Sequence, residues 1–319
     1  MSQLSAPLPG GAPISDISYR DYNGPLHTRA IRWWIVAAAG MRMLTRRPGF
    51  WILSALSLMP YLSAGLLFYF QSLGAQLGQL TPPYPVGQKY AGHFWGALEW
   101  QQLSLFLIAL MIGAGSIAAD NRTNALLVYL SKPLTKGDYL LGKWMGVFLT
   151  LFLIALVPAL VLYAYCLISF RTKGFLTEEP LLILRLIGAA AMPALIHASL
   201  LLGFSAWSKT PRLSGALYAG IYMVGGFVSQ VIGLIVYRGD LSEGILLRHM
   251  SIGGIISGLT QQIYGFTILT RGFHRSRGVE VLALDPPVLW ITVAVAAGLV
   301  VTGIVAARTK IQAVEVIRG

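Results

Sequence analysis

Long apolar stretches separated by short polar connections dominate the pattern of this chain. A helix of about 20 apolar residues can cross the hydrocarbon core of a bilayer, and six segments of the sequence reach that length. The pattern therefore predicts an all-α polytopic membrane protein with six transmembrane helices. We place these helices at about 50–71, 100–119, 144–168, 181–207, 213–237 and 288–307.

Composition supports a membrane protein with little room for a soluble domain. Of the 319 residues, 55% are hydrophobic and only 11% are charged, which is about half the charged fraction of an average soluble domain. The single cysteine, Cys166, lies inside an apolar run, so the sequence offers neither a disulfide framework nor a cysteine metal cluster. We attribute the net charge of +12 mainly to loops that face anionic membrane lipid. No separate basic and aromatic module is present, so no nucleic-acid partner is expected.

The distribution of cations predicts the orientation. If the N-terminus is cytoplasmic, the segments on that side hold 15 Lys and Arg residues and the outer loops hold 8. Cytoplasmic loops of membrane proteins carry the excess of Lys and Arg. This bias predicts that both termini are cytoplasmic and that the number of spans is even.

The segment ahead of the first span divides into two parts. Residues 1–27 are rich in Pro, Gly, Ser and Ala and predict a mobile cytoplasmic tail, without the pattern of a cleaved signal peptide. Residues 28–47 predict an interfacial helix in the headgroup layer, because its arginines fall on an arc of about 140°. A plain cationic flank of the first span is the alternative. The arginines are Arg29, Arg32, Arg42, Arg46 and Arg47.

The external segment 238–287 is the least regular part of the chain. Residues 244–270 are apolar enough to resemble a seventh span, but Arg248 and Gln261 argue against exposure to lipid. A seventh span would also place the cationic C-terminal tail outside. We therefore expect short re-entrant or surface helices on the outer side.

A charged loop, residues 120–143, separates the second and third predicted spans. Leu126, Leu127 and Leu130 form a helical apolar stripe, Pro133 ends that helix, and Thr135 can cap the next one. The pattern predicts a short amphipathic helix at about 120–131 that touches a cytoplasmic partner.

This loop resembles the one between the second and third spans of ABC-2 type permeases, the membrane subunits of type V ABC transporters. It departs from their usual pattern at Asn124, Ala125 and Leu127, where Gly, Thr and an acidic residue are common. The matching positions are Asp120, Leu126, Leu130, Pro133, Thr135, Lys136, Leu141, Gly142 and Lys143.

The resemblance implies that residues 28–319 form a permease domain with short external helices between spans five and six. Such a subunit pairs with a second copy or a paralogue in the bacterial cytoplasmic (inner) membrane, and its usual direction is export. Two separate ABC ATPases would bind ATP and Mg, so this chain would need no cofactor and would not be an enzyme. We expect the residues that couple the chain to the ATPases to be Asp120, Arg122, Leu126, Leu130, Pro133, Lys136 and Asp138.

Two other classes of function are the alternatives. A membrane scaffold or sensor could recruit cytoplasmic partners without moving a substrate. A secondary carrier usually needs an acid inside the membrane, and none of the twelve acids lies at the centre of a predicted span. We also find no Ser/His/Asp grouping, metal-ligand spacing or paired carboxylates, so no catalytic or metal site is expected.

Several polar positions have a structural explanation that we prefer to a functional one. Residues 137–143 match G-x-x-x-x-G-K, but Trp144 stands where a P-loop needs Ser or Thr, so no nucleotide site is expected. His197 suggests a packing hydrogen bond rather than a relay, and Arg185 suggests a side chain that snorkels. An aromatic belt explains the cluster before span two better than a surface for an extracytoplasmic partner. That cluster comprises His93, Trp95, Glu99 and Trp100.

Overall fold

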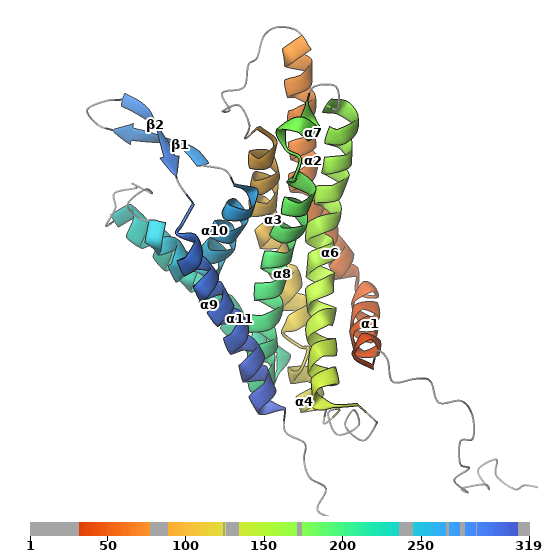
Figure 1. The fold of residues 1–319 in the computed structure, drawn as a ribbon. Helices are drawn as coiled ribbons and strands as arrows, with labels where there is room; N and C mark the ends of the chain where they lie inside the picture. The colour runs from red at the N-terminus through yellow and green to blue at the C-terminus, as the bar shows by residue number, and fades with distance from the viewer. Residues whose placement is uncertain are drawn as a thin grey trace, which may run out of the picture. The chain divides into compact units, whose positions relative to one another are not determined.

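Six long apolar helices form the body of the protein, in agreement with the predicted fold class (Figure 1). Each is long and apolar enough to cross a membrane. They are α2 (Pro48–Gln76), α3 (Lys89–Gly113), α6 (Lys136–Phe170), α8 (Leu182–Trp207), α9 (Pro211–Ile235) and α11 (Leu289–Lys310). The computed structural model describes residues 32–76, 89–123, 125, 134–170, 174–235, 245–265, 268–274, 278–284 and 286–311.

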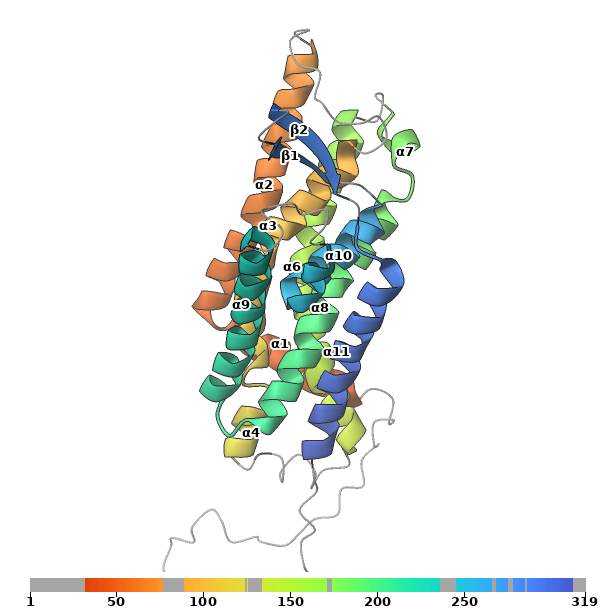
Figure 2. The same cartoon turned by 90° about the vertical axis from the view of Figure 1, so that its left-hand side faces the viewer.

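Helix α8 is the centre of the bundle. It contacts α3, α6, α9 and α11, and Figure 2 shows it between α9 and α11. In an apolar 18-residue stretch of α8, 72% is buried, whereas in the corresponding stretch of α9 only 6% is buried. The apolar side chains of α9 therefore face outward, where lipid or another membrane chain can cover them.

Small residues allow the closest helix contacts. A Cβ atom on Gly203 of α8 would lie 2.9 Å from the backbone oxygen of Gly303 in α11. Helix α1 (Arg32–Thr45) packs on α6 in the same way, because a Cβ on Gly142 would lie 2.6 Å from the backbone oxygen of Trp33. Such small residues let helix backbones approach each other in membranes.

The interfacial helix predicted at 28–47 corresponds to α1, which is shorter. Arg32 and Arg42 lie on α1, whereas Arg46 and Arg47 lie in the turn before α2, so their placement on this helix was wrong. The indole nitrogen of Trp51 donates to the backbone oxygen of Thr45 at 2.8 Å, which satisfies a carbonyl at the end of α1. Arg29 lies outside the described residues.

The second span begins earlier than predicted. Helix α3 starts at Lys89 rather than near residue 100, so Glu99 lies inside a candidate span instead of before it. Arg248, Ser257 and Thr260 approach its carboxyl group. We expected no acid at the centre of a span, but Glu99 is the eleventh of the 25 residues of α3. That expectation therefore no longer argues against a carrier.

The external segment contains short helices, as predicted, and no seventh span among its described residues. A 3₁₀ helix, η2 (Ile245–Met250), leads into α10 (Ile252–Tyr264), whose first turn Ser251 caps through the amide of Gly254 at 3.0 Å. The 13 residues of α10 extend only about 20 Å, too short to cross a bilayer. Gly265 ends α10 in the left-handed conformation.

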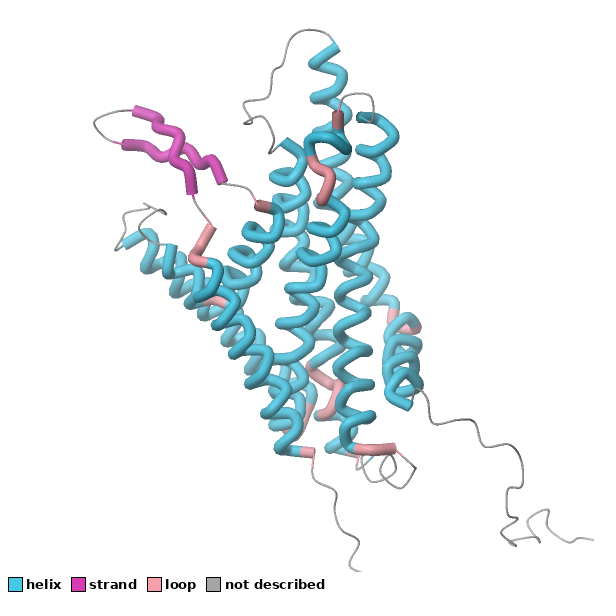
Figure 3. The backbone as a smooth tube through the Cα atoms, in the orientation of Figure 1, coloured by secondary structure: helices cyan, strands magenta, loops and turns pink. Residues whose placement is uncertain are grey.

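The same segment contains a β-hairpin that we did not predict from the sequence. Strands β1 (Ile268–His274) and β2 (Gly278–Leu284) pair antiparallel, with Ile268 opposite Leu284 and His274 opposite Gly278 (Figure 3). This hairpin is the only sheet in the described part of the chain. It lies with the short helix α7 (Phe175–Glu178) toward one end of the bundle.

Candidate functional site

The opposite end of the bundle gathers the ends of several helices, and we call it the loop end. Helix α3 ends there at Gly113, and a turn at 114–117 leads into the short helix α4 (Ala118–Arg122). Helix α4 contacts both α8 and α9. The connection between α8 and α9 is only residues 208–210, so the two helices form a helical hairpin.

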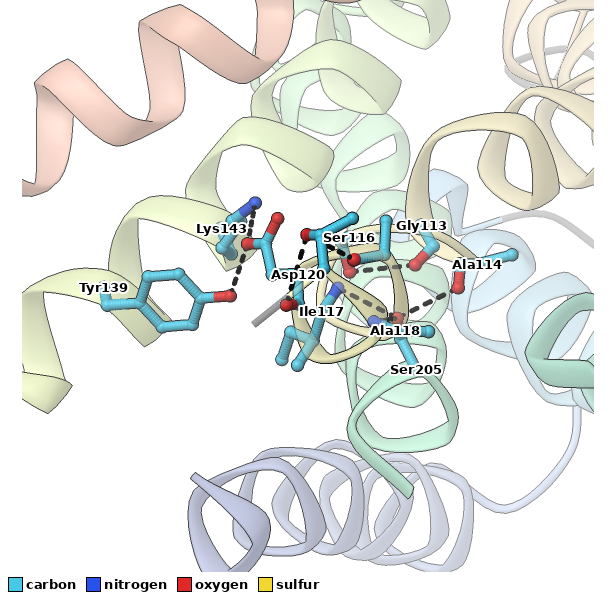
Figure 4. A network of polar contacts seen from close by, with 11 residues as sticks. Gly113, Ala114, Ser116, Ile117, Ala118, Asp120, Tyr139, Lys143 and Ser205 are labelled. Carbon is cyan, nitrogen blue, oxygen red and sulfur yellow. Dashed lines mark hydrogen bonds and ion pairs between the residues drawn. The ribbon is translucent and has the colours of Figure 1, made fainter. Parts of the chain in front are cut away.

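A buried serine attaches the turn before α4 to the central helix (Figure 4). The hydroxyl of Ser205 donates to the backbone oxygen of Ala114 at 2.9 Å. It also accepts from the amides of Ile117 and Ala118, at 3.0 and 2.9 Å. One side chain of α8 thus satisfies three backbone groups that the irregular turn leaves without helical partners.

An ion pair attaches α4 to α6. Asp120 Oδ2 lies 2.7 Å from Lys143 Nζ and accepts the hydroxyl hydrogen of Tyr139, also at 2.7 Å (Figure 4). The side chains of Lys143 and Asp120 are only 18% and 15% exposed, so the charges are poorly screened by water. Tyr139 and Lys143 are four residues apart and lie on the same face of α6.

A capping box fixes the start of α6. The hydroxyl of Thr135 accepts from the amide of Asp138 at 3.0 Å, and the Asp138 carboxylate accepts from the amide and hydroxyl of Thr135. This reciprocal pattern confirms the predicted cap at Thr135. It also gives Asp138, one of the predicted coupling residues, a role within the helix end.

The other predicted coupling residues are not brought into this network. Arg122 and Lys136 are exposed on either side of the segment between α4 and α6. Neither forms an ion pair within the described residues. Leu126, Leu130 and Pro133 lie outside the described part of the chain.

The resemblance to a P-loop at 137–143 has no structural basis. All seven residues belong to the first turns of α6, whereas a P-loop requires a loop whose amides surround the phosphate. The lysine of the pattern, Lys143, is paired with Asp120 instead.

A cleft that the sequence analysis did not identify opens beside this network. It has a volume of about 740 Å³ and lies between α1, the 110–120 region, the start of α6 and the start of α9. Arg47, Lys143 and Arg212 border it, and Asp120 is its acidic residue. Helical spacing could not reveal the site, because it depends on how four separate segments pack.

Two polar residues of α8 have partners on other elements. His197 Nδ1 lies 2.5 Å from the hydroxyl of Tyr218 on α9, which confirms a helix-packing hydrogen bond. Arg185 does not simply snorkel, as predicted. It donates to Glu179 and to the backbone oxygen of Tyr264, both at 2.9 Å.

Glu179 is buried beside the start of α8. Burial raises the pKa of its carboxyl group above the usual value, although the nearby Arg185 guanidinium acts in the opposite direction. The attraction therefore only partly offsets the cost of removing the carboxylate from water. Arg185 also joins α8 to the C-terminal end of α10 through its hydrogen bond to Tyr264, the last helical residue.

Comparison with known proteins agrees with the fold and with the resemblance of the loop. No curated protein matches the chain significantly. A family model described as "ABC-2 family transporter protein" matches residues 34–306, a range that includes all six candidate spans except the last residues of α11. The chain is therefore a multi-pass membrane protein that belongs to the ABC-2 family of ABC transporter permeases.

Proposed function

We propose that this chain is the permease subunit of an exporter and that two separate ABC ATPases drive it through the loop end. The observation that carries this proposal is the contrast between fixed and free charges there. Asp120 and Lys143 attach α4 to α6, whereas the exposed Arg122 and Lys136 have no ion-pair partner within the described residues.

Rigid attachment is what force transmission requires. A load on the segment between α4 and α6 passes to α6 through the Asp120–Lys143 pair. It passes to α8 through Ser205 and through Asn121. The side-chain amide of Asn121 donates to the backbone oxygen of Ala206 at 3.4 Å. Since α8 contacts four other spans, it can distribute the movement through the bundle.

We place the protein in the bacterial inner membrane, with the loop end and both termini on the cytoplasmic side. Arg42, Arg122, Lys209 and Arg308 are exposed on elements that reach this end, which supports the orientation expected from the distribution of cations. In this orientation the β-hairpin and α10 face outward, where an extracytoplasmic partner could contact them.

The proposed assembly contains a second permease copy or a paralogue. Six spans are half of the twelve expected for a complete transporter. The largely exposed apolar faces of α2 and α9 offer surfaces on which a second membrane chain could pack. ATP and Mg would be bound by the two ATPase subunits, so the coupling residues of this chain would act mechanically rather than chemically.

The test is to copurify this chain with the ATPase that a neighbouring gene encodes and to measure ATP hydrolysis by the complex. The double variant Arg122→Glu/Lys136→Glu should retain membrane insertion but lose most of the hydrolysis stimulated by the permease, because opposite charges would repel a complementary surface.

The matched control is Lys209→Glu/Arg308→Glu, which makes the same change of charge on two other exposed cations. If both double variants retain stimulation equally, the assigned coupling surface is wrong. If the full-length chain binds no ATPase at all, the proposal of an ATPase-driven permease fails, and a scaffold is favoured instead.

A further inference from the structure

The cleft at the loop end has the features of a lipid headgroup site. Its volume of about 740 Å³ lies within the range of pockets that hold small molecules. It is bounded by α1, the region 110–120, the start of α6 and the start of α9. These four segments are distant in sequence, so the fold itself creates the cleft.

The border of the cleft carries an excess of positive charge. Arg47, Lys143 and Arg212 line it together with one carboxylate, that of Asp120. That carboxylate already forms an ion pair with Lys143 and accepts a hydrogen bond from Tyr139. Arg47 and Arg212 form no ion pair with the residues that the structure describes, so two exposed guanidinium groups remain able to bind an anion.

The position of these two arginines matches the level of lipid headgroups. Arg47 immediately precedes α2, and Arg212 is the second residue of α9. Both therefore lie at the ends of membrane spans, where headgroups are found. The first turn of α9, a helix of 25 residues, adds the positive end of its dipole to the same side of the cleft.

The floor of the cleft is apolar and lined by small residues. Ala39 and Gly40 of α1 and Gly215 of α9 line it, and Met43 and Leu110 supply apolar surface. A Cβ atom on Gly40 would meet nothing within 4 Å, so space is open beside the helix. A hydrated inorganic anion would gain nothing from this floor, whereas an acyl chain would gain by leaving water.

We propose that this cleft binds an anionic phospholipid, with the phosphate between Arg47 and Arg212 and the upper acyl chain on the small-residue floor. The bound lipid would join α1 to the start of α9. The phosphate chemistry is shared by free phosphate esters, but the apolar floor favours the lipid. The inference requires only the membrane-embedded chain and does not depend on an ATPase.

Native mass spectrometry of the full-length protein in detergent tests the headgroup. Phosphatidylglycerol should bind more tightly than phosphatidylcholine with the same acyl chains. In Arg47→Gln/Arg212→Gln the affinity for phosphatidylglycerol should fall about tenfold or more. The control Arg46→Gln/Lys209→Gln removes two nearby exposed cations that do not line the cleft and should have little effect.

Gly40→Leu tests the floor without changing charge. The new side chain should fill the cleft and weaken binding of phosphatidylglycerol, whereas Gly298→Leu, which also faces open space on α11, should not. Circular dichroism and gel filtration check that each variant folds. If the arginine double variant does not fold, Arg212→Gln alone is measured in its place.

Four outcomes would overturn the proposal. The first is equal binding of phosphatidylglycerol and phosphatidylcholine. The second is an equal loss of phosphatidylglycerol affinity in the arginine double variant and its control. The third is displacement of the lipid by glycerol phosphate at equal concentration. The fourth is a change of oligomeric state in Gly40→Leu with lipid binding intact, which would mean that a second copy of the chain covers the cleft.

Discussion

The ammonium of Lys143 lies 2.7 Å from a carboxylate oxygen of Asp120, and the hydroxyl of Tyr139 donates to that same oxygen. Asp120 is the third residue of α4, which follows α3, and its partners Tyr139 and Lys143 lie in the first and second turns of α6. The contact is largely enclosed by protein. It therefore holds the two sides of the charged loop at a fixed separation.

We predict that Asp120 and Lys143 are energetically coupled. Asp120→Asn or Lys143→Met should each lower the stability by about 2 kcal/mol, since each leaves one largely buried charge without its partner. The double variant should lose less than the sum of the two. Thermal unfolding followed by tryptophan fluorescence measures the cycle. Strictly additive losses would mean that the pair contributes nothing to the attachment of α4.

Removal of the Ser205 hydroxyl should have a larger effect than its size suggests. Ser205→Ala leaves the amides of Ile117 and Ala118 and the carbonyl of Ala114 without that partner. Buried unpaired backbone groups cost about 1–3 kcal/mol. Ser63→Ala is the control, because the exposed Ser63 hydroxyl makes one hydrogen bond to Pro60. Equal melting temperatures of the two variants would contradict the role assigned to Ser205.

Sequence reasoning identified the six spans because hydropathy reports membrane crossing directly. It failed where polar residues are buried by other elements. Glu99 was placed before the second span, which was predicted to begin at about residue 100, but α3 begins at Lys89, and Ser257 and Thr260 of α10 approach the Glu99 carboxyl group. The position of α10 cannot be read from the pattern of α3. The β-hairpin was missed because the segment was considered only as helix or loop.

The site shows the same division. The spacing of Thr135 and Asp138 is local, so the cap at the start of α6 could be predicted. Tyr139 and Lys143 share a helix face, but their partner Asp120 precedes Tyr139 by 19 residues. The contact of Ser205 with Ala114 spans 91 residues. Such pairs follow from tertiary packing, and a single sequence does not contain them.

The crossing of α8 and α11 should tolerate no side chain at Gly303. A Cβ atom there would overlap the backbone oxygen of Ser199, so Gly303→Ala should separate the helices and lower the melting temperature. Gly298→Ala on the same helix faces open space and should be neutral or stabilising by up to about 1 kcal/mol, since Ala has the higher helix propensity. A loss of stability in Gly298→Ala as large as that in Gly303→Ala would show that the close contact is not the cause.

The buried carboxyl group of Glu179 gives the stability a pH dependence with a defined sign. Burial raises its pKa in the folded protein above the usual value near 4.5, so the folded protein retains the proton to higher pH than the unfolded chain. As the pH rises from about 4.5 through the raised pKa, the wild type loses this contribution to stability. Glu179→Gln cannot titrate, and the melting temperature of the variant relative to the wild type should therefore increase across the same window.

The measurement is the difference in melting temperature between Glu179→Gln and the wild type at a series of pH values from 4 to 8. The other acids titrate in both proteins, so this difference isolates the contribution of Glu179. Arg185 donates to Glu179 at 2.9 Å, and its attraction opposes the effect of burial. A difference that decreases with rising pH would mean that the ion pair with Arg185 outweighs the desolvation of the carboxylate.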